Sequence, residues 1–232
     1  MFKIQSSLDN ASNDKNTRVI IVSAEGSSFS AGHDLKELKA GRKSTDKGKN
    51  YFKEVMAKCS TLMKSIVNNP KPVIAEVAGV ATAAGCQLVA SCDLAYAGKS
   101  ARFATPGVNI GLFCSTPMVA LSRNVSNKHS MEMLLTGELV SAEKAEKIGL
   151  INKVLDDSLL QSYTLEIARK ISKKSSMTLK IGKAAFYKQV DMNLSEAYDY
   201  TSNVMVENML KIDAEEGMDA FIEKRNPNWK DK

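Results

Sequence analysis

Residues Pro72 to Leu88 read PVIAEVAGVATAAGCQL and repeat a pattern that opens earlier with RVIIVSAEGSSFSAGHDL, Arg18 to Leu35. In each copy, an apolar run typical of a strand buried on both faces leads into a turn of small residues that opens a helix. The first N–H groups of a helix have no partner within that helix, and small residues let a ligand approach them. Two such turns side by side would form an oxyanion hole, although the same turns also occur for packing alone.

The rest of the chain is predicted to be α/β, with a mostly helical second half. Apolar residues at helical spacing predict a long amphipathic helix over residues 46–68, which Pro70 and Pro72 terminate. Ser141 and Ser195 are each expected to cap a helix. Strands are expected at 18–23, 72–77, 93–97 and 151–155, a loop at 101–115, and a helix from Leu35. Further helices are expected at 84–91, 116–124, 128–136, 141–148, 158–172, 177–190, 195–210 and 215–224.

Composition is that of an ordinary globular protein. The 232 residues are 44% hydrophobic and 25% charged, which excludes a disordered chain and a disulfide scaffold. The net charge of +6 fits a solvated basic surface or a pocket for a phosphate-rich small molecule. No nucleic-acid partner is expected, because zinc-finger spacing and ribonucleoprotein aromatic motifs are missing.

The apolar segment from Val73 to Ala97 is long enough to span a bilayer. It contains Glu76 and Asp93, and an acidic residue at the centre of a span costs about 2.5–3.5 kcal/mol. We therefore expect a buried strand, a helix and a second strand, and no membrane span. No cysteine pair has CxxC spacing, so neither a metal site nor a disulfide is expected, and the thiols are predicted to be buried and reduced. The cysteines are Cys59, Cys86, Cys92 and Cys114.

Four stretches resemble motifs of the enoyl-CoA hydratase/isomerase, or crotonase, superfamily. FSAGHDLKEL (29–38) and KPVIAEVAGVATAAGCQLVASCDLAYA (71–97) are similar to its first two signatures. TGELVSAEKAEKIGLINKV (136–154) and EGMDAFIEKRNPNW (216–229) are similar to later motifs, in the same order. The resemblance implies the α/β crotonase fold, with a spiral of ββα units in residues 1–172. It also implies a helical region, 173–232, through which such proteins form trimers or hexamers.

The resemblance also implies where an acyl-CoA would bind. The backbone N–H groups of His33 and Ala84 would hold the thioester carbonyl oxygen, with the His33 side chain expected to turn to solvent. Lys224 would approach the CoA phosphates of a neighbouring subunit, or would be a solvated lysine. CoA would be a substrate or ligand, not a permanent cofactor. It would lie along the backbone of a segment comprising Ala31, His33, Asp34, Leu35 and Lys36.

The sequence departs from the family pattern at the two glutamates that a hydratase uses as acid and base. Gln87, in GCQL (85–88), takes the place of the first, and Gly107, in TPG (105–107), takes the place of the second. An amide is not a base at neutral pH and glycine has no side chain, so weak or no hydratase activity is predicted. The family's Gly-Gly-Gly turn reads Ala-Ala-Gly here (83–85).

Three side chains near these motifs admit two interpretations each. Asp34 is expected to stabilise the start of its helix instead of acting as a base. Cys114 is weighed as a nucleophile, but no base accompanies it. Asn109 is weighed as a ligand for a substrate carboxylate or as a turn cap.

Three functional hypotheses follow. The first is an acyl-CoA-binding family member in mitochondrial fatty-acid metabolism. Its leader would lie outside this chain, because residues 1–16 match only the late part of the family's first helix and contain no transit peptide. The second is an acyl-CoA decarboxylase, or another enolate-stabilising enzyme, that uses the oxyanion hole and His33. The third is a non-catalytic partner in mixed oligomers. Whether the chain is an enzyme stays open.

Overall fold

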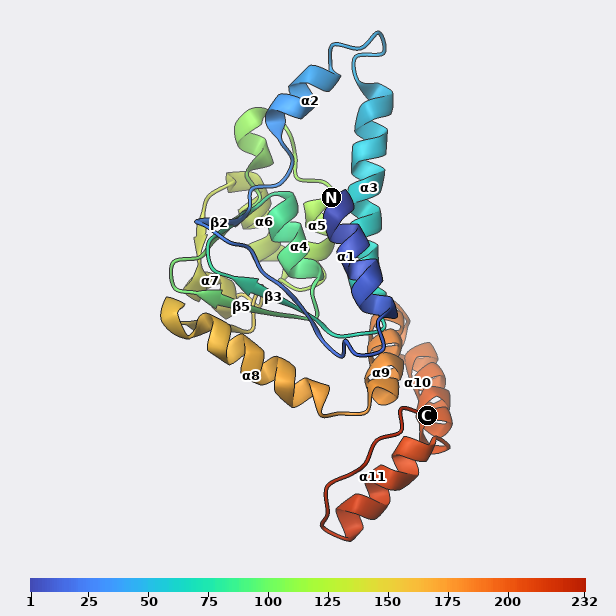
Figure 1. Ribbon diagram of the computed structural model, residues 1–232. Helices are drawn as coiled ribbons and strands as arrows, with labels where there is room; N and C mark the ends of the chain where they lie inside the picture. The colour runs from blue at the N-terminus through green and yellow to red at the C-terminus, as the bar shows by residue number, and fades with distance from the viewer.

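The strands of the chain form two four-stranded sheets, and the first six strands alternate between them. Figure 1 shows these strands at the centre of the molecule with helices around them. The computed structural model describes residues 1–232. Sheet A has the order β1-β3-β5-β8 and is parallel throughout. Sheet B has the order β2-β4-β6-β7 and is parallel except for the β6–β7 pair. Sheet A consists of β1 (Ile20–Val22), β3 (Val73–Val77), β5 (Leu94–Gly98) and β8 (Lys153–Leu155). Sheet B consists of β2 (Ser28–Ser30), β4 (Val80–Thr82), β6 (Arg102–Ala104) and β7 (Val140–Ser141).

Each of the strand pairs β1–β2, β3–β4 and β5–β6 contributes one strand to each sheet. The second pair leads directly into α4 (Ala84–Ser91), so the chain forms the expected spiral of ββα units and the predicted fold class is confirmed. Helix α4 packs against β2 and β4, and also against α3 (Lys49–Val67) and α5 (Pro117–Leu121). Helix α8 (Leu160–Ser172) covers β3 and β5 of sheet A.

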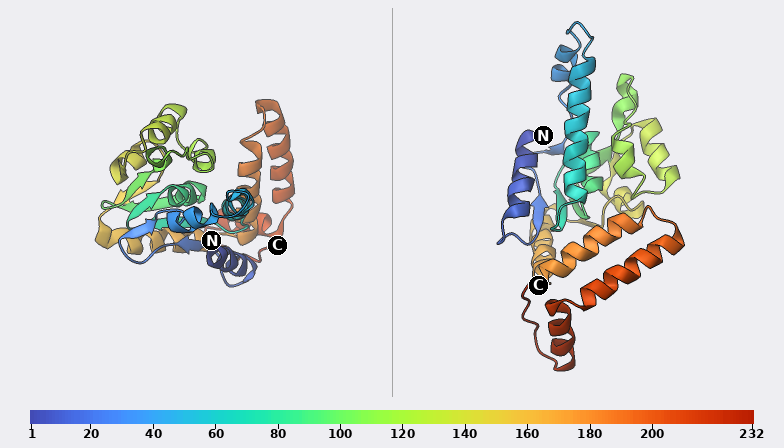
Figure 2. Two further views of the ribbon diagram at one scale, coloured as in Figure 1. Left: turned by 90° about the horizontal axis from the view of Figure 1, so that it is seen from above. Right: turned by 90° about the vertical axis from the view of Figure 1, so that its right-hand side faces the viewer.

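The remaining helices surround this core and extend from it. Helix α2 (Leu35–Gly41) and the start of α3 project beyond the sheets, at the top of Figure 1. Helices α9 (Ser176–Gln189) and α10 (Leu194–Met209) lie side by side outside the sheets, as Figure 2 shows. The other helices are α1 (Phe2–Asn13), α6 (Asn127–Thr136), α7 (Ala142–Lys147) and α11 (Ile212–Ile222), with short 3₁₀ helices η1 (Pro106–Ile110) and η2 (Asp157–Leu159).

The long elements of the sequence analysis are confirmed, and the short strands were missed. The predicted helix 46–68 is α3, and the predicted strand 72–77 is β3. However, β2 and β4 lie inside the two segments expected to be turns, and β6 lies inside the expected loop 101–115. Each of these strands has three residues, too few to show an alternating pattern.

Two local predictions about strand burial and capping were wrong. Strand β1 is half-buried, not buried on both faces, because it lies at the edge of sheet A. Ser195 does not cap α10, because Asn193 occupies the cap and its Oδ1 accepts the N–H of Glu196 at 3.0 Å. Ser141 does cap α7, as expected.

A buried ion pair joins α9 to the core. Lys183 Nζ lies 2.7 Å from Asp93 Oδ2 and also donates to two backbone carbonyls, each at 3.0 Å. Tyr187 donates its hydroxyl to the other carboxylate oxygen of Asp93 at 2.9 Å. Burial lowers the pKa of Lys183, and burial together with Asp93 raises the pKa of Tyr187. This latch positions the first helix of the C-terminal region against the strand that begins at Leu94.

Glycine is required where α4 meets the end of β2. A Cβ on Gly85 would collide with the carbonyl oxygen of Ser30, whereas a Cβ on Gly182 of α9 would meet nothing within 4 Å. Gly85→Ala is therefore expected to lower the free energy of unfolding by about 3 kcal/mol or more. Gly182→Ala, the matched control, is expected to raise it by about 0.5–1 kcal/mol. Urea unfolding followed by circular dichroism measures both, and equal effects would contradict the packing described here.

Candidate active site

Three parallel strands of sheet B end at the same edge of the sheet. The segments that follow β2, β4 and β6 are residues 31–33, 83–84 and 105–107. Because the carboxyl ends of parallel strands meet at one edge, residues far apart in the sequence become neighbours there. The positions predicted for the oxyanion hole and for the two replaced glutamates all lie on or next to these segments.

The first two turns are in direct contact. Gly32 has a φ of +92°, and a Cβ there would lie 3.1 Å from the Cβ of Ala83 and 3.2 Å from the backbone nitrogen of Ala84. The hydroxyl of Thr82 donates to the carbonyl oxygen of Ala31 at 3.3 Å. The contact brings the residue after Gly32 and the first residue of α4 to one place.

Two backbone N–H groups at this contact are available to a ligand. The N–H of His33 makes no hydrogen bond within the chain. Ala84 is the first residue of α4, so its N–H has no acceptor within its own helix. The geometry therefore fits two donors directed at one oxygen atom.

Ala83 holds a backbone conformation that suits glycine better. Its φ is 51° and its ψ is −118°, outside the regions that alanine prefers. Its N–H donates to the carbonyl of Ala104 at 2.9 Å, and its carbonyl accepts the N–H of Gln87 at 3.0 Å. These bonds hold a strained residue at the point where β4 turns into α4.

The side chain of His33 does not turn to solvent, so that expectation was wrong. The residue is half-buried, and its Nε2 atom is sealed from solvent with no hydrogen-bond partner. Burial lowers the pKa of the imidazole, and the Met1 ammonium lowers it further. A neutral imidazole at pH 7 can donate or accept one hydrogen bond at that nitrogen.

The segment after His33 is exposed and regular. Asp34 caps α2, with Oδ1 accepting the N–H of Lys36 at 2.7 Å, so its carboxylate stabilises the helix start as expected. Ala31, Asp34, Leu35 and Lys36 are all exposed.

Gln87 and Gly107, the replaced glutamate positions, are both buried. The Gln87 Oε1 atom accepts a weak hydrogen bond from the thiol of Cys59, with an S···O distance of 3.8 Å. The N–H of Gly107 donates to Cys114 Sγ at 3.3 Å. A Cβ on Gly107 would lie 2.7 Å from the Leu112 carbonyl oxygen and 2.9 Å from that sulfur. Cys114 thus fills the space where a side chain at position 107 would begin.

All four cysteines are buried, as predicted, and none of them forms a disulfide. Burial raises the pKa of Cys114, although the Gly107 N–H opposes the shift. Burial raises the pKa of Cys86 to about 12. A raised pKa disfavours the thiolate, so Cys114 lacks the property that a nucleophilic cysteine needs.

Two further candidate residues are exposed to solvent. Lys224 is exposed just beyond the end of α11, in the C-terminal region that projects from the sheets (Figure 1). Asn109 is exposed on η1, and its Nδ2 donates to the Gly137 carbonyl at 3.5 Å. That contact ties η1 to the end of α6.

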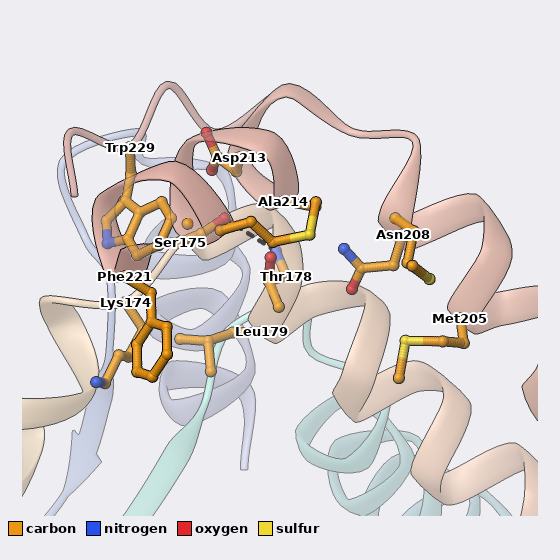
Figure 3. A pocket seen from close by; sticks show the side chains of 13 residues that line it. Lys174, Ser175, Thr178, Leu179, Met205, Asn208, Asp213, Ala214, Phe221 and Trp229 are labelled. Carbon is orange, nitrogen blue, oxygen red and sulfur yellow. Dashed lines mark hydrogen bonds between the residues drawn. The ribbon is translucent and has the colours of Figure 1, made fainter. Parts of the chain in front are cut away.

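A separate cavity of about 630 Å³ lies among α9, α10 and α11 (Figure 3). None of the predicted site residues lines it. Its walls include the apolar side chains of Leu179, Met205, Met209, Met218, Phe221 and Trp229. No motif or periodic pattern in the sequence indicates this cavity.

No group of three or more His, Cys, Asp or Glu side chains is arranged to hold a metal ion. None of the helices combines the length and the apolar character needed to cross a membrane. The segment 73–97 forms β3, β4, α4 and β5.

The chain belongs to the enoyl-CoA hydratase/isomerase family, whose sequence pattern matches residues 1–232. The resemblance inferred from the four motifs is thereby confirmed.

Its relatives include proteins called enoyl-CoA hydratase domain-containing protein 3, mitochondrial. Those of Xenopus laevis and Homo sapiens are 52% and 50% identical over 226 residues, which is 97% of this chain and 75% and 73% of theirs. The crystal structure of the human protein of that name matches with a TM-score of 0.93 at 50% identity, over 98% of this chain and 88% of that chain. An enoyl-CoA hydratase structure from Mycobacterium smegmatis matches with a TM-score of 0.92 at 44% identity, over 98% of this chain and 87% of that chain.

The sequence did not indicate that two cysteines contact the positions matched to the family's glutamates, Gln87 and Gly107. Cys59 lies 28 residues before Gln87, on a different helix, and no local pattern links them. Cys114 was weighed only as a nucleophile, whereas it packs against Gly107. The Lys183–Asp93 pair, 90 residues apart, also left no local signal.

The burial of His33 predicts how stability depends on pH. Its folded-state pKa is lowered, so below about pH 6.5 the unfolded chain binds a proton that the native chain does not. Stability therefore falls as the pH drops through this range. His33→Gln is expected to lose less unfolding free energy than the wild type between pH 7.5 and 5.5, measured by urea unfolding.

The main cause of this shift is burial, so the difference between the two proteins is expected to persist in 0.5 M NaCl. Parallel pH curves for the wild type and the variant would refute the assignment.

Proposed function

We propose that the chain binds acyl-CoA thioesters at the edge where β2, β4 and β6 end. The thioester carbonyl oxygen would accept hydrogen bonds from the N–H groups of His33 and Ala84. One observation carries the proposal, namely the contact of Gly32 against the backbone of Ala84, which joins the two turns. Family membership supports it, because the turns carry the family's first two signatures.

The CoA moiety would run along the exposed backbone from Ala31 to Lys36. The Asp34 carboxylate is engaged in capping α2, so this segment would contribute main-chain groups. Lys224 would reach CoA phosphates from a neighbouring subunit of a homotrimer or hexamer. Exposed apolar side chains support the assignment of residues 173–232 to oligomerisation, and they include Leu194, Met205, Leu210, Phe221 and Ile222.

We propose weak or no hydratase activity, in a mitochondrial role in fatty-acid metabolism. Gln87 and Gly107 supply neither of the two carboxylates that hydration uses. Each missing acid or base is worth about 10²–10⁴ in rate. The location rests on relatives that are named mitochondrial.

Decarboxylation is a second candidate, which the inward side chain of His33 favours. Loss of CO₂ from a malonyl-type thioester itself generates the enolate, so an oxyanion hole suffices without a strong base. The Nδ1 atom of His33, which makes no hydrogen bond within the chain and is not sealed from solvent, would donate to the carboxylate. Release of CO₂ from malonyl-CoA, lost in His33→Gln, would establish this candidate over simple binding.

Acyl-CoA binding is tested by thermal unfolding with butyryl-CoA. At about 100 times its dissociation constant a ligand adds about 2.7 kcal/mol, which is a rise in Tm of about 5–11 °C for a chain of this length. Ala84→Pro removes one N–H donor and is expected to reduce the shift strongly. Asn127→Pro, at the exposed first position of α6, is the matched control and is expected to keep the shift. A folded wild type with no shift would overturn the proposal.

The absence of hydratase activity is tested with crotonyl-CoA. Without both carboxylates, kcat/KM is expected to be at least about 10⁴-fold below that of a relative that has them. Hydration is followed by the loss of enoyl-thioester absorbance. Efficient hydration that disappears in Ala84→Pro would show that the chain is an active hydratase.

A further inference from the structure

The Gln87 side chain is buried, and only its amide oxygen has a hydrogen-bond partner. The residue is 5% exposed, and its Oε1 accepts the hydrogen bond from the thiol of Cys59, which is 1% exposed. Burial raises the pKa of Cys59, so the sulfur keeps its proton and stays a donor. The amide oxygen is therefore occupied, and the NH₂ group is turned the other way.

The amide nitrogen of Gln87 has no partner in the chain. Nε2 donates no hydrogen bond, and it is not sealed from solvent, in contrast to Nε2 of His33. Buried polar groups nearly always have a hydrogen-bond partner. Leaving such a donor unsatisfied when a ligand excludes water costs about 1–3 kcal/mol. A ligand that carries an acceptor at this point avoids that cost.

Gln87 lies one helical turn after Ala84, on the same helix α4. Residues three apart lie on one face of a helix, with their Cβ atoms about 5–6 Å apart. The Ala84 N–H is the proposed donor to the thioester oxygen. An acyl chain that extends from a thioester at Ala84 along this face of α4 would bring its α- and β-carbons to the Gln87 NH₂ group.

We propose that Gln87 is a specificity-determining residue that donates a hydrogen bond to an oxygen on the β-carbon of the acyl group, with Cys59 as its positioning residue. The inference rests on the proposed binding of acyl-CoA and names its class. The site selects thioesters with a β-oxygen, such as 3-oxoacyl-CoA, over those with a plain hydrocarbon chain. A glutamate at this position would present a charged acceptor to the β-oxygen, whereas Gln87 presents a neutral donor. The two residues therefore favour different ligands.

The matched probes are acetoacetyl-CoA and butyryl-CoA, which differ by the β-oxygen. Isothermal titration of the wild type is expected to give a dissociation constant about 3- to 10-fold lower for acetoacetyl-CoA, the range of one net hydrogen bond. Gln87→Met keeps the length of the side chain and removes the donor, so the ratio of the two constants is expected to approach one. Gln161→Met, at an exposed position of α8, is the control and is expected to keep the wild-type ratio.

The role of Cys59 is tested by two substitutions at that position. Cys59→Ser keeps a donor for the amide oxygen and is expected to retain the preference for acetoacetyl-CoA. Cys59→Ala removes the donor and frees the amide to rotate. It is therefore expected to weaken the preference for acetoacetyl-CoA over butyryl-CoA. A merely structural role would change both affinities together and leave the ratio alone. This pair also decides the matter if Gln87→Met fails to fold.

The results of these titrations distinguish the specificity role of Gln87 from acyl-CoA binding itself. If the wild type binds both thioesters equally, or if Gln87→Met keeps the preference, the specificity role of Gln87 is overturned and acyl-CoA binding stands. If the wild type binds neither thioester, both proposals fall. A preference that only Gln87→Met and Cys59→Ala abolish supports the assignment.

Discussion

The arrangement of the site depends on the close approach of α4 to the end of β2. Gly85 lies so near the carbonyl oxygen of Ser30 that no side chain fits between them. This approach brings the turn after β2 against the turn after β4, and it aligns the start of α4 with the backbone of His33. The strained conformation of Ala83 is a consequence, because the chain must pass from strand to helix within one residue at that point.

Around these two turns, the positions matched to the family's two glutamates hold Gln87 and Gly107. One glutamate position holds an amide whose oxygen is bound by a thiol, and the other holds a glycine whose side-chain space is filled by a sulfur atom. In the proposed site, neither position would supply the acid or base of hydration, whereas the binding of a carbonyl oxygen would need only the two N–H groups. His33 and Gln87 would provide neutral hydrogen-bond donors, which suit the proposed recognition of an acyl group better than addition of water.

The C-terminal helices are coupled to the core by charge as well as by packing. The ammonium of Lys183 is taken out of water, and Asp93 and two backbone carbonyls replace its hydration. Loss of one member of such a pair leaves the other buried and uncompensated, which is strongly destabilising. The interactions of Lys183 and Tyr187 with Asp93 thus fix α9 against the core, and α10 and α11 follow it in the chain. The apolar cavity among these helices belongs to this extension and is separate from the turns (Figure 3).

The amino-acid sequence by itself determined the family, the long helix α3 and the buried strand β3, and it predicted that Gln87 and Gly107 take the places of the family's glutamates. Those features have local signals, either a motif or a periodic pattern long enough to recognise. Only the tertiary structure decided sheet B, whose strands are too short for a periodic signal. It also decided the inward side chain of His33, the thiol that orients Gln87 and the sulfur that packs against Gly107. The Cys59–Gln87 contact joins two helices and spans 28 residues, so it arises from tertiary packing and leaves no trace in the neighbouring sequence. Cys114 and Gly107 are only seven residues apart, but no periodic pattern shows that the loop folds the sulfur back onto the glycine.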